Sequence, residues 1–390
     1  MLGRRMARRS RRRRRSAQVE AIRPNPIRRR TEVATAASRK SGRSGSAVRA
    51  LPHRTIARAL GWAGAGMALA ALAGAVSSRL IAARTRKLVP ADGRIVRLET
   101  GTLHYMEMGD PQAPPLVLIH GLGGQIRNFS HSFVDKLDGY RIIVLDRPGS
   151  GYSSSAAGRT GSLEHQAGFV AEAIAHLGLE RPLLIGHSLG GAVSLAVALH
   201  HPYSVGGLAL VAPLTRPPVV PWLLRSSLFQ SEQLQKVMAS TFALPIMALT
   251  AEARRKHVFW PSTSPDDFDA RGGGMAIRTP KAAAAALADI AGLAQELERM
   301  VSRYHEIDVP VRILFGRNDR ILDATFHGSV VELMPDAKLE LCDGGHMLPI
   351  SDATLVAAWL RRTRSTEAGA NIDRAIARCS RRIERRGRSH

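Results

Sequence analysis

The sequence predicts an α/β fold with a mainly parallel, doubly wound sheet and a helical cap insertion. Two observations lead to this prediction. From about residue 92, short apolar runs alternate with helical stretches, which is typical of parallel sheets covered on both faces. Residues 214–305 then interrupt this rhythm with apolar sequence that lacks strand character. An insertion of that length between two core strands predicts a cap over the strand ends.

The strands are expected in a regular order along the chain. An antiparallel pair is expected first, at 94–98 and 103–108, and the amphipathic run at 338–341 predicts an edge strand. Helices are expected at 164–177 and 192–200. Continuous apolar runs predict strands buried on both faces at 116–119, 141–145, 182–185, 208–211 and 311–315. In such a sheet, ligands bind outside the carboxyl ends of the strands.

The formal net charge of +24 lies in two tails. Residues 1–58 contain 19 Lys and Arg against two acidic residues, and residues 361–390 contain ten against three. The first tail lacks hydrophobic periodicity and is expected to be disordered. It also lacks aromatic residues that could stack on bases, so we expect anionic lipid rather than nucleic acid as its partner. RNA binding by the tails and a translation start at Met6 or later remain as alternatives.

Residues 59–78 contain no charge and are long enough to cross a bilayer. We expect a transmembrane signal anchor over residues 59–83. A cleaved signal peptide is one alternative, because 73–75 resembles a small-residue cleavage site, and a buried soluble helix is another. The basic residues flanking the segment are balanced, and only the distal Arg clusters favour a cytoplasmic N-terminus. The expectation is a single-pass, membrane-anchored protein whose body is extracytoplasmic.

These patterns divide the chain. The two cysteines, Cys342 and Cys379, form no disulfide framework that would report the compartment. The expected parts are a disordered tail at 1–58, the anchor at 59–83, a first core part at 84–213, the cap at 214–305, a second core part at 306–362 and a basic tail at 363–390.

Residues 186–191 read Gly-His-Ser-Leu-Gly-Gly, between an apolar run and a helical stretch. A sharp turn from strand to helix would hold the Ser188 hydroxyl at the tip of the sheet, beside the amides of a helix N-terminus. Gly186 and Gly190 remove side chains that would collide where strand and helix cross. The motif predicts a nucleophile, and the alternative is a Gly-rich turn with an incidental serine.

A serine nucleophile needs a base, usually a histidine held by a carboxylate. Asp319 follows the run at 311–315, and His346 follows the run at 338–341, so both are expected at carboxyl ends of strands. The order Ser188, Asp319, His346 matches one known arrangement of such triads. Asp323 competes as the carboxylate. The competing histidines are His120, His187 and His305.

Acyl transfer also needs donors for the developing oxyanion, commonly two backbone amides. The segment His120-Gly121-Leu122-Gly123-Gly124 follows the strand expected at 116–119, and its glycines let the backbone approach a ligand. The amides of Leu122 and Leu189 are the expected pair. The alternative for this segment is a flexible turn.

Over residues 92–362 the chain resembles the α/β-hydrolase superfamily. The motifs that carry the resemblance lie at 120–124, 146–153, 186–191, 315–319 and 344–346. The resemblance implies that segment 146–153 is structural and lines the site. It does not fix the substrate, because esterases, lipases, thioesterases, C–C bond hydrolases and cofactor-free haloperoxidases share these motifs. Ser188 stands where dehalogenases and epoxide hydrolases carry a carboxylate, which sets those two groups aside.

The expected activity is hydrolysis of a carboxylic ester, or related acyl bond, of a hydrophobic small molecule or lipid. No metal motif, phosphate loop or dinucleotide fingerprint occurs in the sequence, so no cofactor or metal is expected. The alternatives are a C–C bond hydrolase or acyltransferase with the same triad, and a non-catalytic membrane-tethered binding protein. Substrate identity and oligomeric state stay open. The residues expected to contact substrate are His120, Gly121, His187, Trp222 and Phe229.

Overall fold

The structure is a computed structural model that describes residues 53–156, 160–219, 226 and 229–363. Most of the two predicted tails, 1–58 and 363–390, lies outside the described residues, but the prediction of disorder is wrong for residues 53–58, which are helical. Trp222 also lies outside the described residues.

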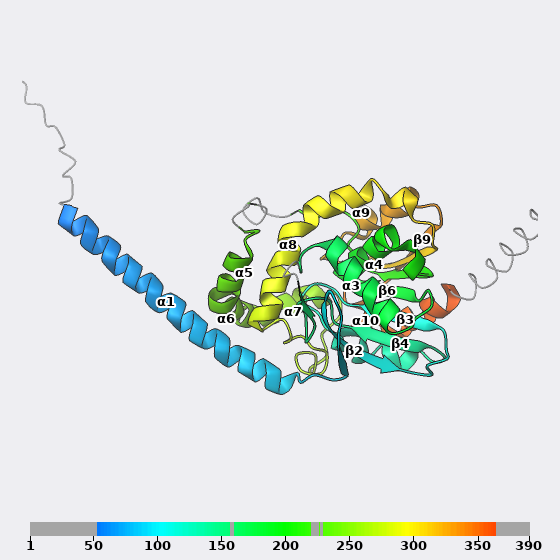
Figure 1. The fold of residues 1–390 in the computed structure, drawn as a ribbon, viewed down its shortest axis with the longest axis horizontal. Coiled ribbons are helices and arrows are strands. Elements are labelled where there is room, and N and C mark those ends of the chain that lie inside the picture. The colour runs from blue at the N-terminus through cyan, green and yellow to red at the C-terminus, as the bar shows by residue number, and fades with distance from the viewer. Residues whose placement is uncertain (1–52, 157–159, 220–225, 227–228, 364–390) are drawn as a thin grey trace, which may run out of the picture. The chain divides into compact units, whose positions relative to one another are not determined.

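A single mixed sheet forms the centre of the body, with strand order β1-β2-β4-β3-β6-β7-β8-β9 (Figure 1). β1 and β2 are antiparallel, and every ladder from β4 to β9 is parallel. The strands are β1 Arg94–Arg97, β2 Gly101–Met108, β3 Pro115–Ile119, β4 Arg141–Leu145, β5 Ser154–Ser155, β6 Leu183–His187, β7 Gly207–Val211, β8 Val311–Gly316 and β9 Ala337–Cys342. All eight predicted strands are present. The short β5, which pairs with β2, was not predicted, because two serines carry no hydrophobic pattern.

Helices cover both faces of the sheet. Alternate residues of a strand point to opposite faces, so Val117 packs with α3 and α4 in one core cluster while Leu116 and Leu118 pack in the other, with Trp359. This double coverage explains why the predicted runs were continuously apolar. The helices of the body include α2 Arg127–Ser130, α3 Leu163–His176, α4 Leu189–His200, α9 Ala324–Gly328 and α10 Leu348–Ser351, and a further helical segment spans 353–363.

The insertion between β7 and β8 is helical. Among its described residues no strand occurs, which agrees with the predicted cap. Its longest helix, α8, begins where the Thr279 side chain accepts a hydrogen bond from the Ala282 amide and Pro280 occupies the first turn. The cap helices are α5 Glu232–Met238, α6 Leu244–Leu249, α7 Ala251–Phe259 and α8 Pro280–Val301, and a π-helical turn at Ala239–Ala243 joins the first two.

The predicted anchor is one helix, α1 (His53–Leu88), which extends beyond residues 59–83 at both ends. Its segment Leu60–Leu88 is long and apolar enough to cross a membrane, and only 11% of its most apolar window is buried. That exposure does not fit a buried soluble helix. Contacts with the cap are confined to the C-terminal half, where Ser78 Oγ donates a hydrogen bond to the Thr241 carbonyl at 3.3 Å and Ala82 packs against the cap.

Candidate active site

Ser188 stands between β6 and α4 in a backbone conformation that side chains rarely adopt. Its φ is 53° and its ψ is −119°, which is strained for a residue other than glycine. The surroundings hold it there, because the Ser188 amide donates to the Val211 carbonyl at 3.1 Å and the Leu214 amide donates to the Ser188 carbonyl at 2.9 Å. The predicted strained turn at the tip of the sheet is therefore present.

The glycines on either side of Ser188 are required by close backbone approach. A Cβ atom on Gly186 would lie 2.5 Å from the Gly190 carbonyl oxygen, and one on Gly190 would lie 2.0 Å from the Ile119 carbonyl oxygen. Both distances are shorter than atoms tolerate. Strand β6, helix α4 and strand β3 thus meet at a point that admits no side chain, which fixes where the serine lies.

We expect Gly190→Ala to destabilise the protein by about 1–3 kcal/mol, because the new methyl group forces backbone to move. The matched control is Gly168→Ala in α3, where the nearest atom to the added Cβ is His201 Nε2 at 3.8 Å. There alanine favours the helix and is expected to stabilise it by about 0.5–1 kcal/mol. The thermal unfolding midpoint should fall in Gly190→Ala and rise in Gly168→Ala. Midpoints that move in the same direction in both variants contradict this prediction.

His346 and Asp319 form a close pair in the loops that follow β9 and β8. His346 Nδ1 lies 2.7 Å from Asp319 Oδ2, and both groups are buried. Asp319 Oδ1 accepts hydrogen bonds from the amides of Ile321 and Leu322. Burial alone would raise the pKa of Asp319, but the hydrogen bond and charge of His346 and the two amides lower it below its usual value. An ionised Asp319 holds the proton of His346 on Nδ1 and leaves Nε2 as the basic nitrogen.

The competing residues are engaged elsewhere. Asp323 caps α9 and accepts from the Phe326 amide at 2.6 Å. His305 is exposed in a short 3₁₀ turn. Ser188 and His346 line the same cavity, although no hydrogen bond joins them among the described residues. Such bonds are often long in ligand-free sites and shorten when substrate binds.

His187 fixes the loop that carries His346. Its Nε2 lies 2.9 Å from the His346 carbonyl oxygen, and the two rings are 5.0 Å apart between centroids. Burial, with a further contribution from His346, lowers the pKa of His187 to about 3. The ring is therefore neutral at physiological pH, with its proton on Nε2. This residue supports the site rather than serving as its base.

The amides predicted as oxyanion donors are those of Leu122 and Leu189. Leu189 is the first residue of α4, so its amide has no acceptor within the helix. The Leu122 amide also donates to no acceptor among the described residues. A Cβ on Gly121 would lie 2.9 Å from Ser188 Cβ, which shows how closely segment 120–124 approaches the serine. Two unpaired amides near a nucleophile can hold an oxyanion.

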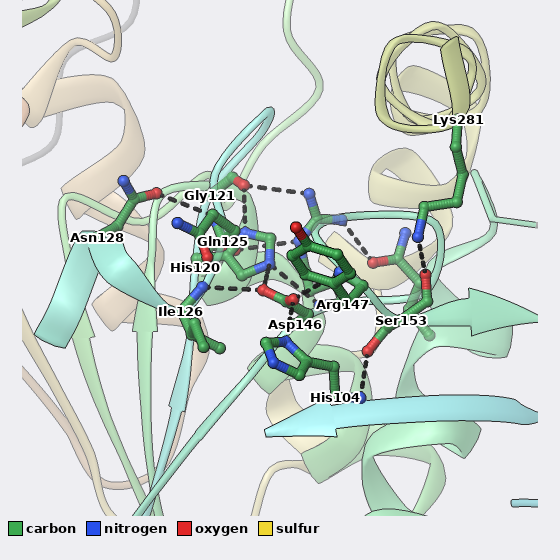
Figure 2. A network of polar contacts seen from close by, with 12 residues as sticks. His104, His120, Gly121, Gln125, Ile126, Asn128, Asp146, Arg147, Ser153 and Lys281 are labelled. Atoms are coloured by element: carbon green, nitrogen blue, oxygen red, sulfur yellow. Dashed lines mark hydrogen bonds and ion pairs between the residues drawn. The ribbon is translucent and has the colours of Figure 1, made fainter. Parts of the chain in front are cut away.

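Arg147 holds the segment 120–124 from behind (Figure 2). Its guanidinium donates to the carbonyl oxygens of His120 and Gly121, at 3.1 Å each, and its amide donates to His120 Nε2 at 3.0 Å. Asp289 of α8 pairs with the same guanidinium at 3.1 Å, and Gln166 of α3 accepts from it at 2.7 Å. Arg147 is fully buried. It thus ties the candidate oxyanion loop to one cap helix and one body helix.

The segment 146–153 was expected to be structural and to line the site. The structure places it behind the site, because neither Asp146 nor Arg147 is among the residues lining the cavity. Asp146 accepts hydrogen bonds from His104 Nδ1 and the Ile126 amide (Figure 2), and from the Tyr152 amide. In the sequence, only the motif at 146–153 pointed to this network. Asp289 and Gln166 belong to no motif, so their part in it could not be predicted.

The cavity at the site has a volume of about 500 Å³. Gly121 and His187 line it, as predicted for substrate contacts. His120 does not, because its buried ring is engaged by the Arg147 amide and by the Gly121 carbonyl oxygen. Phe229 is half-buried near α5 and is also absent from the lining. The substrate-contact prediction for His120 and Phe229 therefore has no support in this geometry.

We expect acid to destabilise the protein through its buried histidines. Burial is the main cause that lowers the pKa values of His120 and His187 to about 3, whereas unfolded histidine titrates near about 6.5. The unfolded chain binds more protons between these values, so stability is full above about pH 6.5 and falls as pH drops. Each ring contributes up to about 1.4 kcal/mol per pH unit.

The measurement is the thermal unfolding midpoint of the full-length chain between about pH 7.5 and pH 5. His187→Gln retains a side-chain donor and cannot ionise. Its midpoint should fall less with pH than that of the unaltered protein. Parallel pH profiles for the two proteins contradict the assignment.

Comparison with known proteins gives the following similarities. A family model described as alpha/beta hydrolase fold matches residues 114–353. The acetyltransferase component of the acetoin cleaving system of Pseudomonas putida is 40% identical over 110 residues, which cover 28% of this chain and only 30% of that protein. Lipase 1 of Psychrobacter immobilis is 25% identical over 64% of this chain and 76% of its own length. The crystal structure of a bacterial membrane phospholipase A matches with a TM-score of 0.55 at 22% identity, over 80% of this chain and 98% of that one.

Proposed function

This chain belongs to the alpha/beta hydrolase fold family, and we propose that it is a serine hydrolase that cleaves a carboxylic ester or related acyl bond. The observation that carries the proposal is that His346, which lines the same cavity as the strained Ser188, pairs through Nδ1 with Asp319 Oδ2 at 2.7 Å. A serine is a poor nucleophile until a neighbouring base accepts its proton. The buried, ionised Asp319 prepares His346 for that role.

The proposed reaction has two halves. Ser188 Oγ attacks the substrate carbonyl while His346 Nε2 takes its proton, and the Leu122 and Leu189 amides hold the oxyanion. His346 then gives the proton to the leaving group, which departs and leaves an acyl-enzyme. Water, deprotonated by His346, releases the acid and restores the hydroxyl of Ser188. Asp319 stays ionised and stabilises the cationic ring in both halves.

The cavity supports a hydrophobic acyl group. Apolar side chains from the body and the cap line much of it, among them Val258, Ile277 and Leu293. A pocket of about this volume holds a small molecule or one acyl chain. Lipase 1 of Psychrobacter immobilis, a relative over most of the body, agrees with such a substrate class.

The proposal is tested with p-nitrophenyl esters of increasing chain length and the full-length protein. We expect hydrolysis with a preference for one chain length, together with covalent labelling by a fluorophosphonate. C–C bond hydrolysis or acyl transfer on the same triad predicts labelling without efficient ester hydrolysis. Absence of both labelling and hydrolysis indicates a non-catalytic binding protein.

We further propose that α1 anchors the protein in a membrane. The apolar side chains of Leu60, Trp62 and Leu69 are each more than 60% exposed. The cap also exposes apolar side chains, those of Phe242 and Ile246, on the helical segments that pack beside Ser78 and Ala82. Exposed apolar surface of this extent is typical of contact with lipid. Flotation of the full-length chain with liposomes that persists in carbonate, and is lost on deletion of residues 59–83, tests the anchor.

A further inference from the structure

The cavity beside Ser188 has more positive than negative charge on its cap side. Three arginines line it: Arg254 and Arg255 from α7, and Arg278 from the segment before α8. Asp269 is the one carboxylate among the described lining residues. It pairs with Arg255 at 3.4 Å and with Arg278 at 3.3 Å. One carboxylate shared by two guanidiniums, with a third nearby, leaves an excess of positive charge on this wall.

Arg278 is the most enclosed of the three. Its side chain is 11% exposed, and its Nε has no hydrogen-bond partner among the described residues. A guanidinium has five N–H donors and no acceptor, so an unpaired buried N–H is unfavourable unless an acceptor from outside reaches it. The unpaired donor thus points to a ligand that brings an acceptor.

Arg254 lies close enough to Arg278 for the two charges to repel. Burial lowers the pKa of Arg254, and the charge of Arg278 lowers it further despite the opposing effect of Asp269. Its hydrogen bonds go to neutral acceptors, the Met247 carbonyl at 3.2 Å and Thr250 Oγ1 at 3.1 Å. Titratable groups whose pKa values are perturbed by burial and a neighbouring charge cluster at functional sites.

We propose that Arg254, Arg255 and Arg278 bind an anionic group, carboxylate or phosphate, on the substrate of Ser188. Arginine suits this role because its planar fork pairs with two oxygens of such groups. The substrate then has three parts: an ester carbonyl at Ser188, an apolar chain along the cavity and a negative charge at the arginine wall. This inference rests on the proposed function, because the wall belongs to the same cavity.

The test uses two esters of equal chain length, p-nitrophenyl octanoate and the p-nitrophenyl monoester of suberate, which differ in a terminal methyl or carboxylate. The ratio of kcat/KM for the charged over the neutral ester is expected to fall about tenfold or more in Arg278→Met and in Arg254→Met. Arg271→Met is the control, because Arg271 is exposed, pairs with Asp267 and does not line the cavity. It removes the same charge and should leave the ratio unchanged.

An unchanged ratio in both Arg278→Met and Arg254→Met overturns the proposal. If the protein hydrolyses neither ester, the hydrolase assignment fails, and the wall is judged by binding instead. Calorimetry then compares monomethyl suberate with methyl octanoate on the full-length Ser188→Ala protein. Tighter binding of monomethyl suberate that is lost when Arg278→Met is added supports the proposed anion site. Equal binding of the two esters overturns it. Octanoate and octyl phosphate, compared in the same way, distinguish carboxylate from phosphate as the preferred group.

Discussion

Ser188→Ala is expected to lower kcat for ester hydrolysis on the order of 10⁶-fold and to abolish fluorophosphonate labelling. Losses of this size follow the removal of a nucleophile from a preorganised triad, because the remaining members have nothing to activate. The fold should persist, since the elbow is held by backbone bonds from Ser188 to Val211 and Leu214, which alanine retains. Kinetics with p-nitrophenyl esters and thermal unfolding of the same preparation measure the two effects separately.

Ser194→Ala provides the matched control for that experiment. Ser194 lies in α4, the helix that follows Ser188, and its hydroxyl donates to the Gly190 carbonyl at 2.8 Å without lining the cavity. We expect this variant to remain active and to be labelled. If Ser188→Ala is as active as Ser194→Ala, Ser188 is not the nucleophile.

The sequence determined much of the fold because the physical signals were local. Each buried strand was a largely apolar run rich in Val, Ile and Leu, and each was found in its expected order. The need for glycine at Gly186 was local in the same way, since a Cβ there would collide with the carbonyl of Gly190, four positions along the chain, whereas the collision at Gly190 is with the Ile119 carbonyl of the distant strand β3. The candidate triad followed from the rule that parallel strands present their carboxyl ends at one edge.

The remaining features depend on contacts between distant segments. Arg147 is joined to Gln166 and Asp289, 142 positions away on the cap helix, and no sequence pattern announces that pairing. His120 was predicted to contact substrate, but its Nε2 accepts a hydrogen bond from the amide of the same arginine. The arginine wall likewise needs residues of the cap that are apart in sequence to come together, because Asp269 pairs with both Arg255 and Arg278. The sequence of the cap showed only a hydrophobic pattern. Such a pattern predicts that residues are buried but not which residues they contact.

Asp319→Asn is expected to lower kcat about 10⁴-fold while leaving the fold intact. Asp319 Oδ1 accepts from the amides of Ile321 and Leu322, so the amide oxygen of asparagine should take that place. Its NH₂ group then faces His346 Nδ1, which must become an acceptor. The ring proton moves to Nε2, and the nitrogen that faces Ser188 can no longer accept a proton. Steady-state kinetics against the neutral esters measure this loss.

Asp323→Asn distinguishes this carboxylate from its neighbour in sequence. Asp323 caps α9 through the Phe326 amide, and asparagine caps helices about as well as aspartate. Activity and stability should therefore stay near those of the unaltered protein. The reverse result, a large loss in Asp323→Asn and little change in Asp319→Asn, assigns the triad carboxylate to Asp323. It would also require the loop after β8 to rearrange, because in the present geometry the 2.7 Å contact to His346 belongs to Asp319.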